Sequence, residues 1–130
     1  MTSLIQQTIA FDGVTAARLY DTYVDAKNHS AAVGAPARIS GAVGADFAIF
    51  GEDKVRGKTI ALVPGQLIVQ SWRGTVWRDA DPDSLLVLAF TDGSIQLTQA
   101  GVPRHAHEVI ADGWHRMYWT PWREHFGLGR

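Results

Sequence analysis

The sequence predicts an α+β fold, in which helices near both ends of the chain pack on a curved antiparallel sheet. Two observations predict it. Between residues 37 and 100, short apolar runs alternate with glycine-containing turns, and the links between the runs are too short for crossover helices. Residues 105–126 instead show helical periodicity, and three of the chain's five tryptophans lie between Trp114 and Trp122.

The first predicted elements are one strand and two helices. Residues 3–11 alternate between apolar and polar side chains, as in a strand with one solvent-facing side. Asp12 stands where an N-cap is expected, and residues 14–26 form an amphipathic helix whose apolar face is Ala16, Leu19, Tyr20 and Tyr23. Residues 27–34 then predict a second short helix or turn, which ends at Gly34 and Pro36.

Six strand-like runs follow, at residues 37–40, 45–50, 55–63, 66–74, 84–91 and 94–100. The Asp92-Gly93 pair between the last two runs is a strong hairpin signal. Residues 51–54 and 63–66 are typical of tighter turns of the same kind. The sequence therefore predicts an antiparallel meander of about six to seven strands, counting the N-terminal one.

The terminal helix, expected from about His105 to Phe126, is apolar over most of its circumference. One stripe holds Ile110, Trp114, Met117, Tyr118 and Pro121, and a second holds Trp119, Trp122 and Phe126. Pro121 predicts a bend. Gly113 is unfavourable inside a helix, so we expect it to allow a close approach of the helix to the sheet.

Composition narrows the functional classes. A length of 130 residues predicts a single domain over residues 1–130, and a net charge of −1 offers no basic field for nucleic acid. The absence of cysteine excludes disulfides, iron–sulfur clusters and thiolate zinc sites. Neither a secretory signal nor a membrane-spanning segment is evident, so we expect a cytoplasmic protein with no membrane partner.

Candidate catalytic and metal-binding residues are few. His105, His107 and Glu108 miss the H-E-x-x-H zinc pattern, because Ala111 stands at the second histidine position. We therefore expect no metal and no cofactor, and we assign no catalytic residue. His29 follows the first helix, where it is either an acid–base or anchor residue at a pocket mouth or, as we favour, a surface or capping histidine.

The aromatic side chains allow two interpretations: they pack in the hydrophobic core, or they line a ligand cavity between helix and sheet. The candidate ligand-binding residues are Phe50, Trp72, Arg73, Trp77, Trp114, Met117 and Tyr118. Arg73 could bind a ligand carboxylate with both guanidinium nitrogens. We favour the other hypothesis, a surface ion pair with the acidic segment Asp79–Asp83.

Several segments resemble one family in the same order along almost the whole chain. The segments are residues 34–57, residues 57–77, "TQAGVP" and "DGWHRMYWTPWREHF", and the most specific matches are "VPG", Trp72-Arg73, Gly113-Trp114 and "YW.P". They resemble the activator of heat-shock protein 90 ATPase homologue-like domains of the START-related superfamily. The resemblance implies a helix-grip fold, with the sheet wrapped around the C-terminal helix and a cavity between them.

We therefore expect a protein that binds a small hydrophobic or amphipathic molecule in that cavity. One alternative is a cyclase- or hydrolase-type enzyme, which needs a polar residue with a shifted pKa inside the cavity. The other is a co-chaperone-like interaction module, homodimers included, which predicts that Trp77, Trp119 or Trp122 faces solvent. The family's eukaryotic co-chaperone has an additional N-terminal domain, and the charged segments here are short and mixed in sign, so we expect no chaperone partner.

Overall fold

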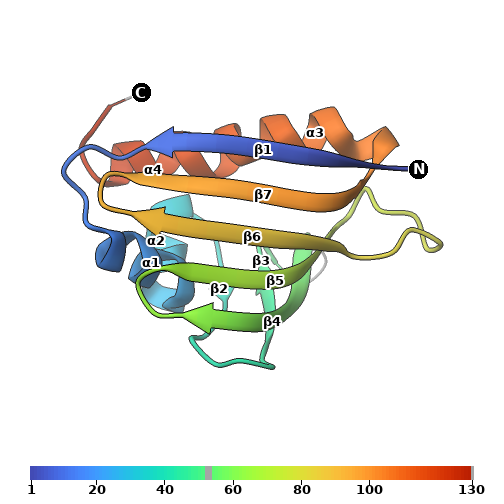
Figure 1. The fold of residues 1–130 in the computed structure, drawn as a ribbon, viewed down its shortest axis with the longest axis horizontal. Helices are drawn as coiled ribbons and strands as arrows, with labels where there is room; N and C mark the ends of the chain where they lie inside the picture. Colours follow the sequence, from blue (N-terminus) through green and yellow to red (C-terminus); the bar gives the residue numbers. More distant parts are fainter. Residues whose placement is uncertain (52–53, 130) are drawn as a thin grey trace.

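A computed structural model describes residues 1–51 and 54–129. Its strands form a single antiparallel sheet in the order β1-β7-β6-β5-β4-β3-β2 (Figure 1), which confirms the predicted meander. The strands are β1 (Thr2–Ala10), β2 (Ala37–Arg38), β3 (Asp46–Ile49), β4 (Val55–Val63), β5 (Leu67–Gly74), β6 (Ser84–Thr91) and β7 (Ser94–Pro103). Each of the seven predicted runs overlaps one of these strands, and β7 extends three residues beyond its predicted end.

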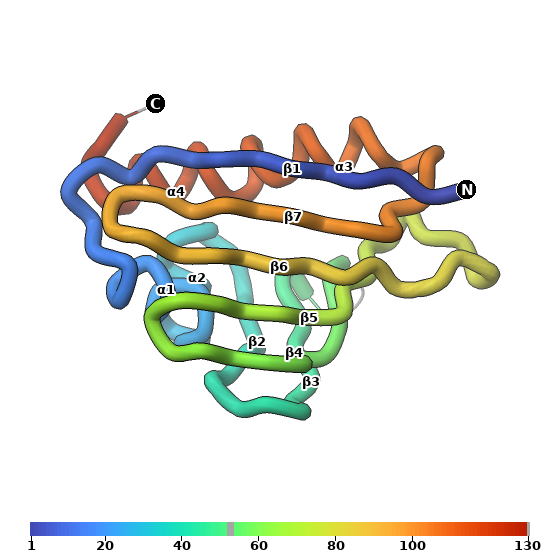
Figure 2. Tube along the Cα trace, viewed as in Figure 1, coloured from blue at the N-terminus to red at the C-terminus, as the bar shows by residue number. Residues whose placement is uncertain are grey.

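The helices lie on one side of this sheet. Helices α1 (Ala16–Val24) and α2 (Ala26–Val33) pack near one end of it, and the C-terminal helical segment runs behind β1 and β7 (Figure 1). That segment consists of a 3₁₀ turn η1 (Arg104–Ala106), α3 (His107–Gly113), a π-helical stretch η2 (Trp114–Trp119) and α4 (Thr120–His125). In Figure 2, β2 and β3 lie behind β4 and β5, so the sheet curves back around the helices. The α+β helix-grip prediction is confirmed.

Helix α1 starts later than the sequence suggested, and Asp12 is not its N-cap. The chain first turns at Gly13, whose φ of 84° places it in the left-handed region, and the amide of Val14 donates to the carbonyl of Phe11 at 3.0 Å. Thr15 is the N-cap instead, since its hydroxyl accepts from the amide of Arg18 at 3.2 Å. The extra turn leaves Asp12 exposed and three residues before the N-cap.

The turns agree with the sequence where they can be compared. Gly93 has a φ of 85° at the β6–β7 hairpin, and Gln66 donates its amide to the carbonyl of Val63 across the β4–β5 turn at 2.8 Å. The turn predicted at residues 51–54 includes residues 52 and 53, which lie outside the described residues. None of the described helices is long and apolar enough to cross a membrane.

The core fills the space between the inner face of the sheet and the C-terminal helix. Phe11 lies at its centre, with its ring centroid 5.9 Å from that of Trp122 and 6.2 Å from that of Trp119. Leu19, Tyr20 and Tyr23 of α1 are buried as predicted. Two glutamines of the sheet accept hydrogen bonds from indole N–H groups of the C-terminal helix. Trp119 Nε1 donates to Gln7 Oε1 at 2.9 Å, and Trp114 Nε1 donates to Gln99 Oε1 at 2.8 Å.

Candidate functional site

A π-helical turn sets the aromatic geometry of the C-terminal helix. The amide of Thr120 donates to the carbonyl of His115, five residues earlier. Because π-type bonds span five residues instead of four, Trp114 and Trp119 come onto one face, and their rings stack at 5.5 Å with an interplanar angle of 14°. The two stripes expected for a regular α-helix are thereby merged. Pro121 lies in the first turn of α4, where its missing amide is tolerated.

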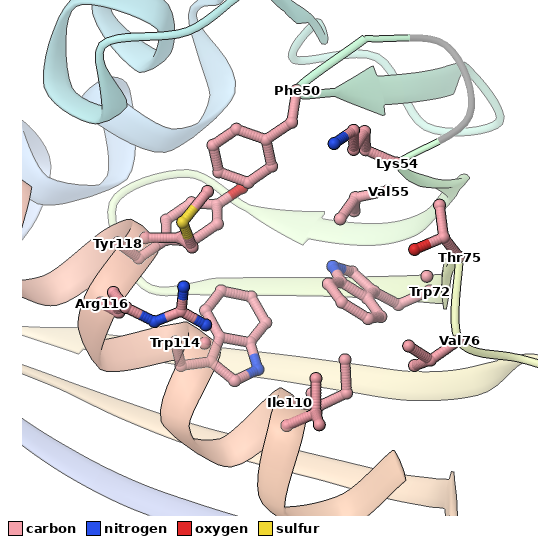
Figure 3. Close-up of a pocket in the computed structure, with 14 residues that line it drawn as sticks. Phe50, Lys54, Val55, Trp72, Thr75, Val76, Ile110, Trp114, Arg116 and Tyr118 are labelled. Carbon is pink, nitrogen blue, oxygen red and sulfur yellow. The ribbon is translucent and has the colours of Figure 1, made fainter.

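A pocket of about 250 Å³ opens where this π turn faces the ends of β3, β4 and β5 (Figure 3). Four rings form much of its wall: Phe50, Trp72, Trp114 and Tyr118. Aliphatic side chains complete the apolar surface, namely Val55, Val76, Val109, Ile110 and Met117. The polar lining residues are Lys54, Thr75 and Arg116. This composition is typical of a site for a small apolar molecule with a few polar anchors.

Trp72 contributes an unsatisfied hydrogen-bond donor. Only 4% of the residue is exposed, and its Nε1 has no hydrogen-bond partner among the described residues. Figure 3 shows this nitrogen on the edge of the ring that faces the middle of the lining side chains. The ring is held in place by neighbouring indoles, with centroids of Trp77 and Trp114 both 5.6 Å away. A buried donor without a partner is costly, which singles this atom out.

Tyr118 is tied to a buried histidine behind the pocket wall. His29 is completely buried, and its Nδ1 lies 2.6 Å from the carbonyl oxygen of Tyr23 while its Nε2 lies 2.9 Å from the hydroxyl of Tyr118. Burial lowers the pKa of His29 to about 4, partly offset by the bond to Tyr23. The neutral ring must donate from Nδ1, because a carbonyl only accepts, so Nε2 accepts the proton of the Tyr118 hydroxyl.

This arrangement limits the chemistry of the wall. Burial raises the pKa of Tyr118 well above its usual value, and the nearby Tyr23 raises it further. Tyr118 therefore remains protonated and directs its proton at His29 instead of at the pocket. Tyr23 is fixed in turn, because its hydroxyl donates to Gln70 Oε1 at 3.0 Å. The network holds the wall rigidly, and Tyr118 does not serve as a general base at neutral pH.

The sequence matches the family model described as "Activator of Hsp90 ATPase homolog 1-like protein" over residues 13–125. The chain belongs to this family. Among curated proteins it is similar to the activator of 90 kDa heat shock protein ATPase homolog of Dictyostelium discoideum, with 26% identity over 101 residues. That match covers 75% of this chain and 26% of the Dictyostelium protein, so the chain spans about a quarter of that relative's length.

Solved structures of the same type share the fold at low identity. An HSP90 activator from Plasmodium falciparum superposes with a TM-score of 0.82 at 19% identity, covering 98% of this chain and 96% of that one. The Aha1 dimer from Colwellia psychrerythraea gives a TM-score of 0.73 at 11% identity, with coverages of 88% and 90%. At these identities the likeness establishes the fold of the Aha1-like chain alone.

In this Aha1-like chain, five of the seven residues predicted as ligand-binding lie around one pocket: Phe50, Trp72, Trp114, Met117 and Tyr118. The other two lie elsewhere. Trp77 supports Trp72 from behind and donates its Nε1 to the carbonyl of Pro82 at 3.1 Å. Arg73 alternates to the other face of β5, where its guanidinium contacts Asp83 Oδ1 at 3.0 Å and the carbonyl of Asp81 at 2.6 Å. The ion pair with the acidic segment is thus the alternative that the structure shows for Arg73.

Two further expectations were wrong. His29 is neither at a pocket mouth nor on the surface, because α2 packs its ring against those of Tyr23 and Tyr118 in the core. Gly113 does not approach the sheet closely, since a Cβ built there would meet no atom within 4 Å. It lines the pocket instead. The glycine that does need a close approach is Gly57, whose added Cβ would lie 1.9 Å from the carbonyl oxygen of Ser71.

Sequence reasoning missed several other pocket residues. Lys54, Thr75 and Val76 belong to strand ends and links, and Val109 and Arg116 are exposed helix residues, so no periodicity marks them. Phe50 carries a signal that only the backbone reveals. Its φ of 63° is in the left-handed region, which a bulky side chain rarely adopts, and its ring meets Tyr118 edge-on at 5.6 Å. Such strain is often found at ligand clamps.

Proposed function

We propose that this protein binds a small hydrophobic or amphipathic molecule in the pocket between the π turn and the ends of β3, β4 and β5. The observation that carries the proposal is an aromatic cavity that the chain's own side chains leave open. A volume of about 250 Å³ is ample, since an apolar cavity of about 150 Å³ accepts benzene. The lining rings are already held in place by one another, so little conformational entropy is lost when a ligand binds.

The open side of the pocket is bordered by residues that can adapt to a guest. Met117 is 39% exposed and Val76 is 38% exposed, so both already lie at the boundary with solvent. Methionine is flexible and polarizable, and it packs against differently shaped partners at little cost. Gly113 adds no side chain to the helix side of the pocket. Fixed aromatic rings at the base and flexible side chains at the mouth favour a ligand-binding role for these residues over a purely structural one.

The first test looks for a retained molecule and then measures binding directly. Native mass spectrometry of freshly purified protein is expected to show a bound small molecule. A titration with the neutral dye phenylnaphthylamine is expected to give one saturable site per chain and to quench tryptophan fluorescence.

Trp114→Ala and Trp122→Ala form a matched pair for this titration, because both indoles are almost fully buried and only Trp114 lines the pocket. Trp114→Ala is expected to change the dye's dissociation constant severalfold, and Trp122→Ala to leave it nearly unchanged in the protein that remains folded. Equal effects of the two substitutions, or dye emission that grows with aggregation, would count against the pocket.

A second candidate function is stimulation of a heat-shock protein 90 ATPase. Family membership favours it, and the Plasmodium falciparum structure described as an HSP90 activator is matched over 96% of its length. Against it, Trp77, Trp119 and Trp122 are all buried, whereas an interaction surface predicts exposed aromatic anchors. A coupled ATPase assay with the chaperone from the same organism tests this function. Saturable, severalfold stimulation would establish it, and we expect no stimulation at micromolar concentration.

Homodimer formation is a related proposal, supported by the dimer of the Colwellia psychrerythraea protein. Sedimentation velocity across a concentration series tests it, because a dimer shifts the sedimentation coefficient with concentration and a monomer does not.

A further inference from the structure

The hydrogen-bonding groups of the pocket are unequal, and this inequality specifies the ligand further. Three buried lining side chains carry an N–H or O–H group: Trp72, Trp114 and Tyr118. Two of these groups are already used inside the protein. Trp114 Nε1 donates to Gln99, and the Tyr118 hydroxyl donates to His29. Trp72 Nε1 is the buried lining donor without a partner among the described residues. A ligand therefore gains most by presenting a hydrogen-bond acceptor to Trp72.

Trp122 shows why the location of this donor matters. Its Nε1 also lacks a partner among the described residues. The ring is packed between Phe11, Trp119 and Phe126, with centroid distances of 5.9, 5.6 and 6.1 Å, and Trp122 does not line the pocket. No ligand can approach that donor without opening the core. Trp72 Nε1 is buried as well, but Trp72 lines the pocket and its nitrogen edge is turned toward it (Figure 3).

The charges at the pocket add a second preference. Lys54 and Arg116 border it from two sides, one on the β4 side and one on the π turn (Figure 3). Arg116 is partly neutralised by Asp112, whose Oδ2 lies 3.7 Å from its Nε. The described lining residues include two basic side chains and no carboxylate. Among the described lining residues, the charge balance therefore favours a negatively charged end of the ligand.

We propose that the pocket is selective for small apolar carboxylates. One carboxylate oxygen accepts a hydrogen bond from Trp72 Nε1, and Lys54 and Arg116 balance the charge from the rim. The apolar body, about one or two rings in size, packs against Trp114, Tyr118 and Phe50. This proposal rests on the proposed binding function and adds the chemical class of the ligand.

The experiment compares three probes of nearly equal shape by isothermal titration calorimetry. Ethylnaphthalene has no acceptor, methyl naphthoate adds a neutral carbonyl acceptor, and naphthoate adds both an acceptor and a charge. We expect methyl naphthoate to bind roughly 5- to 10-fold more tightly than ethylnaphthalene because of the added hydrogen bond. We expect naphthoate to gain about threefold more at low salt and to lose this gain at high salt or in Lys54→Gln.

A spectroscopic readout on the unaltered protein identifies the atom. The indole N–H resonance of Trp72, assigned by its loss in Trp72→Phe, is expected to move downfield with naphthoate and to move little with ethylnaphthalene. Trp72→Phe is expected to bind methyl naphthoate and ethylnaphthalene with similar affinity, and to keep only the salt-dependent preference for naphthoate. Trp122→Phe removes the other unpartnered indole nitrogen and is expected to preserve the wild-type preference.

The outcomes separate the two proposals. If ethylnaphthalene binds as tightly as both oxygen-bearing probes, the carboxylate proposal is wrong while binding in an apolar pocket stands. An unmoved Trp72 resonance in the saturated naphthoate complex also overturns it. If none of the three probes binds, the proposed function itself fails.

Discussion

The two halves of the interface between the C-terminal helix and the sheet are built from the same ring types and differ in how completely they are filled. Around Phe11, Trp119 and Trp122, the ring centroids lie 6.2, 5.9 and 5.6 Å apart, and both tryptophans are at most 1% exposed. Around Trp72, Trp114 and Tyr118, the ring centroids are just as close, at 5.6 and 4.7 Å, but these rings also border an open pocket of about 250 Å³. Aromatic content alone therefore does not distinguish a core from a binding site.

Two features distinguish the halves: a glycine at the helix surface, and the position of a buried indole N–H group without a hydrogen-bond partner among the described residues. Gly113 lines the open half and places no side chain there, whereas Phe126 and Leu128 pack against the buried core. Each half contains one buried indole nitrogen without a partner among the described residues, but only Trp72 lines the pocket. The comparison predicts that substitutions in the filled half change stability and that those in the open half change binding.

The largest expected effect is in the filled half. Trp122→Ala removes a fully buried indole, and we expect a loss of about 3–5 kcal/mol in the free energy of unfolding, because the surrounding rings cannot collapse into the space. Met117→Ala, in the open half, is expected to cost less than about 1 kcal/mol since Met117 is 39% exposed. Urea denaturation measures both. Similar losses for the two variants would remove the distinction between the halves.

The next effect concerns His29, which lies between the halves behind Tyr118. Its pKa is about 4 in the folded protein and about 6.5 when exposed, so the unfolded state binds the additional proton first as the pH falls. We expect roughly 3 kcal/mol of stability to be lost between about pH 7 and pH 4 through this group. The measurement is urea denaturation across that range. His29→Gln serves as the control and is expected to flatten the profile by this amount; an unchanged profile contradicts the buried neutral histidine.

The smallest effect is expected at Gly113, and Gly57 provides the crowded comparison. Gly113→Ala is expected to raise the free energy of unfolding by up to about 1 kcal/mol, because alanine favours the helix and its methyl group enters open space. Gly57→Ala is the matched substitution at a crowded position and is expected to destabilise, since the methyl group would overlap the backbone of β5. Thermal melts of both variants provide the comparison, and a lower midpoint for Gly113→Ala would show that the position is crowded after all.

Local pattern was enough to predict the fold, because strand alternation, the Asp92-Gly93 hairpin and the α1 face are all encoded over a few neighbouring residues. The site was predicted only in part. Trp72, Trp114 and Tyr118 stand out as large rings, but the π turn that brings Trp114 and Trp119 onto one face has no periodicity signal. The partners of Arg73 and His29 depend on long-range packing, which no local pattern fixes.

The most direct test of the central claim, that the open half is a binding site, is a calorimetric titration of Gly113→Leu with ethylnaphthalene beside wild type and Gly113→Ala. The leucine side chain extends into space that is empty around Gly113, so it competes with a ligand without crowding the sheet. We predict one site per chain in wild type, binding weakened at least about tenfold in Gly113→Leu, and a melting midpoint no lower than that of wild type. Undiminished binding to a stably folded Gly113→Leu protein would contradict the account.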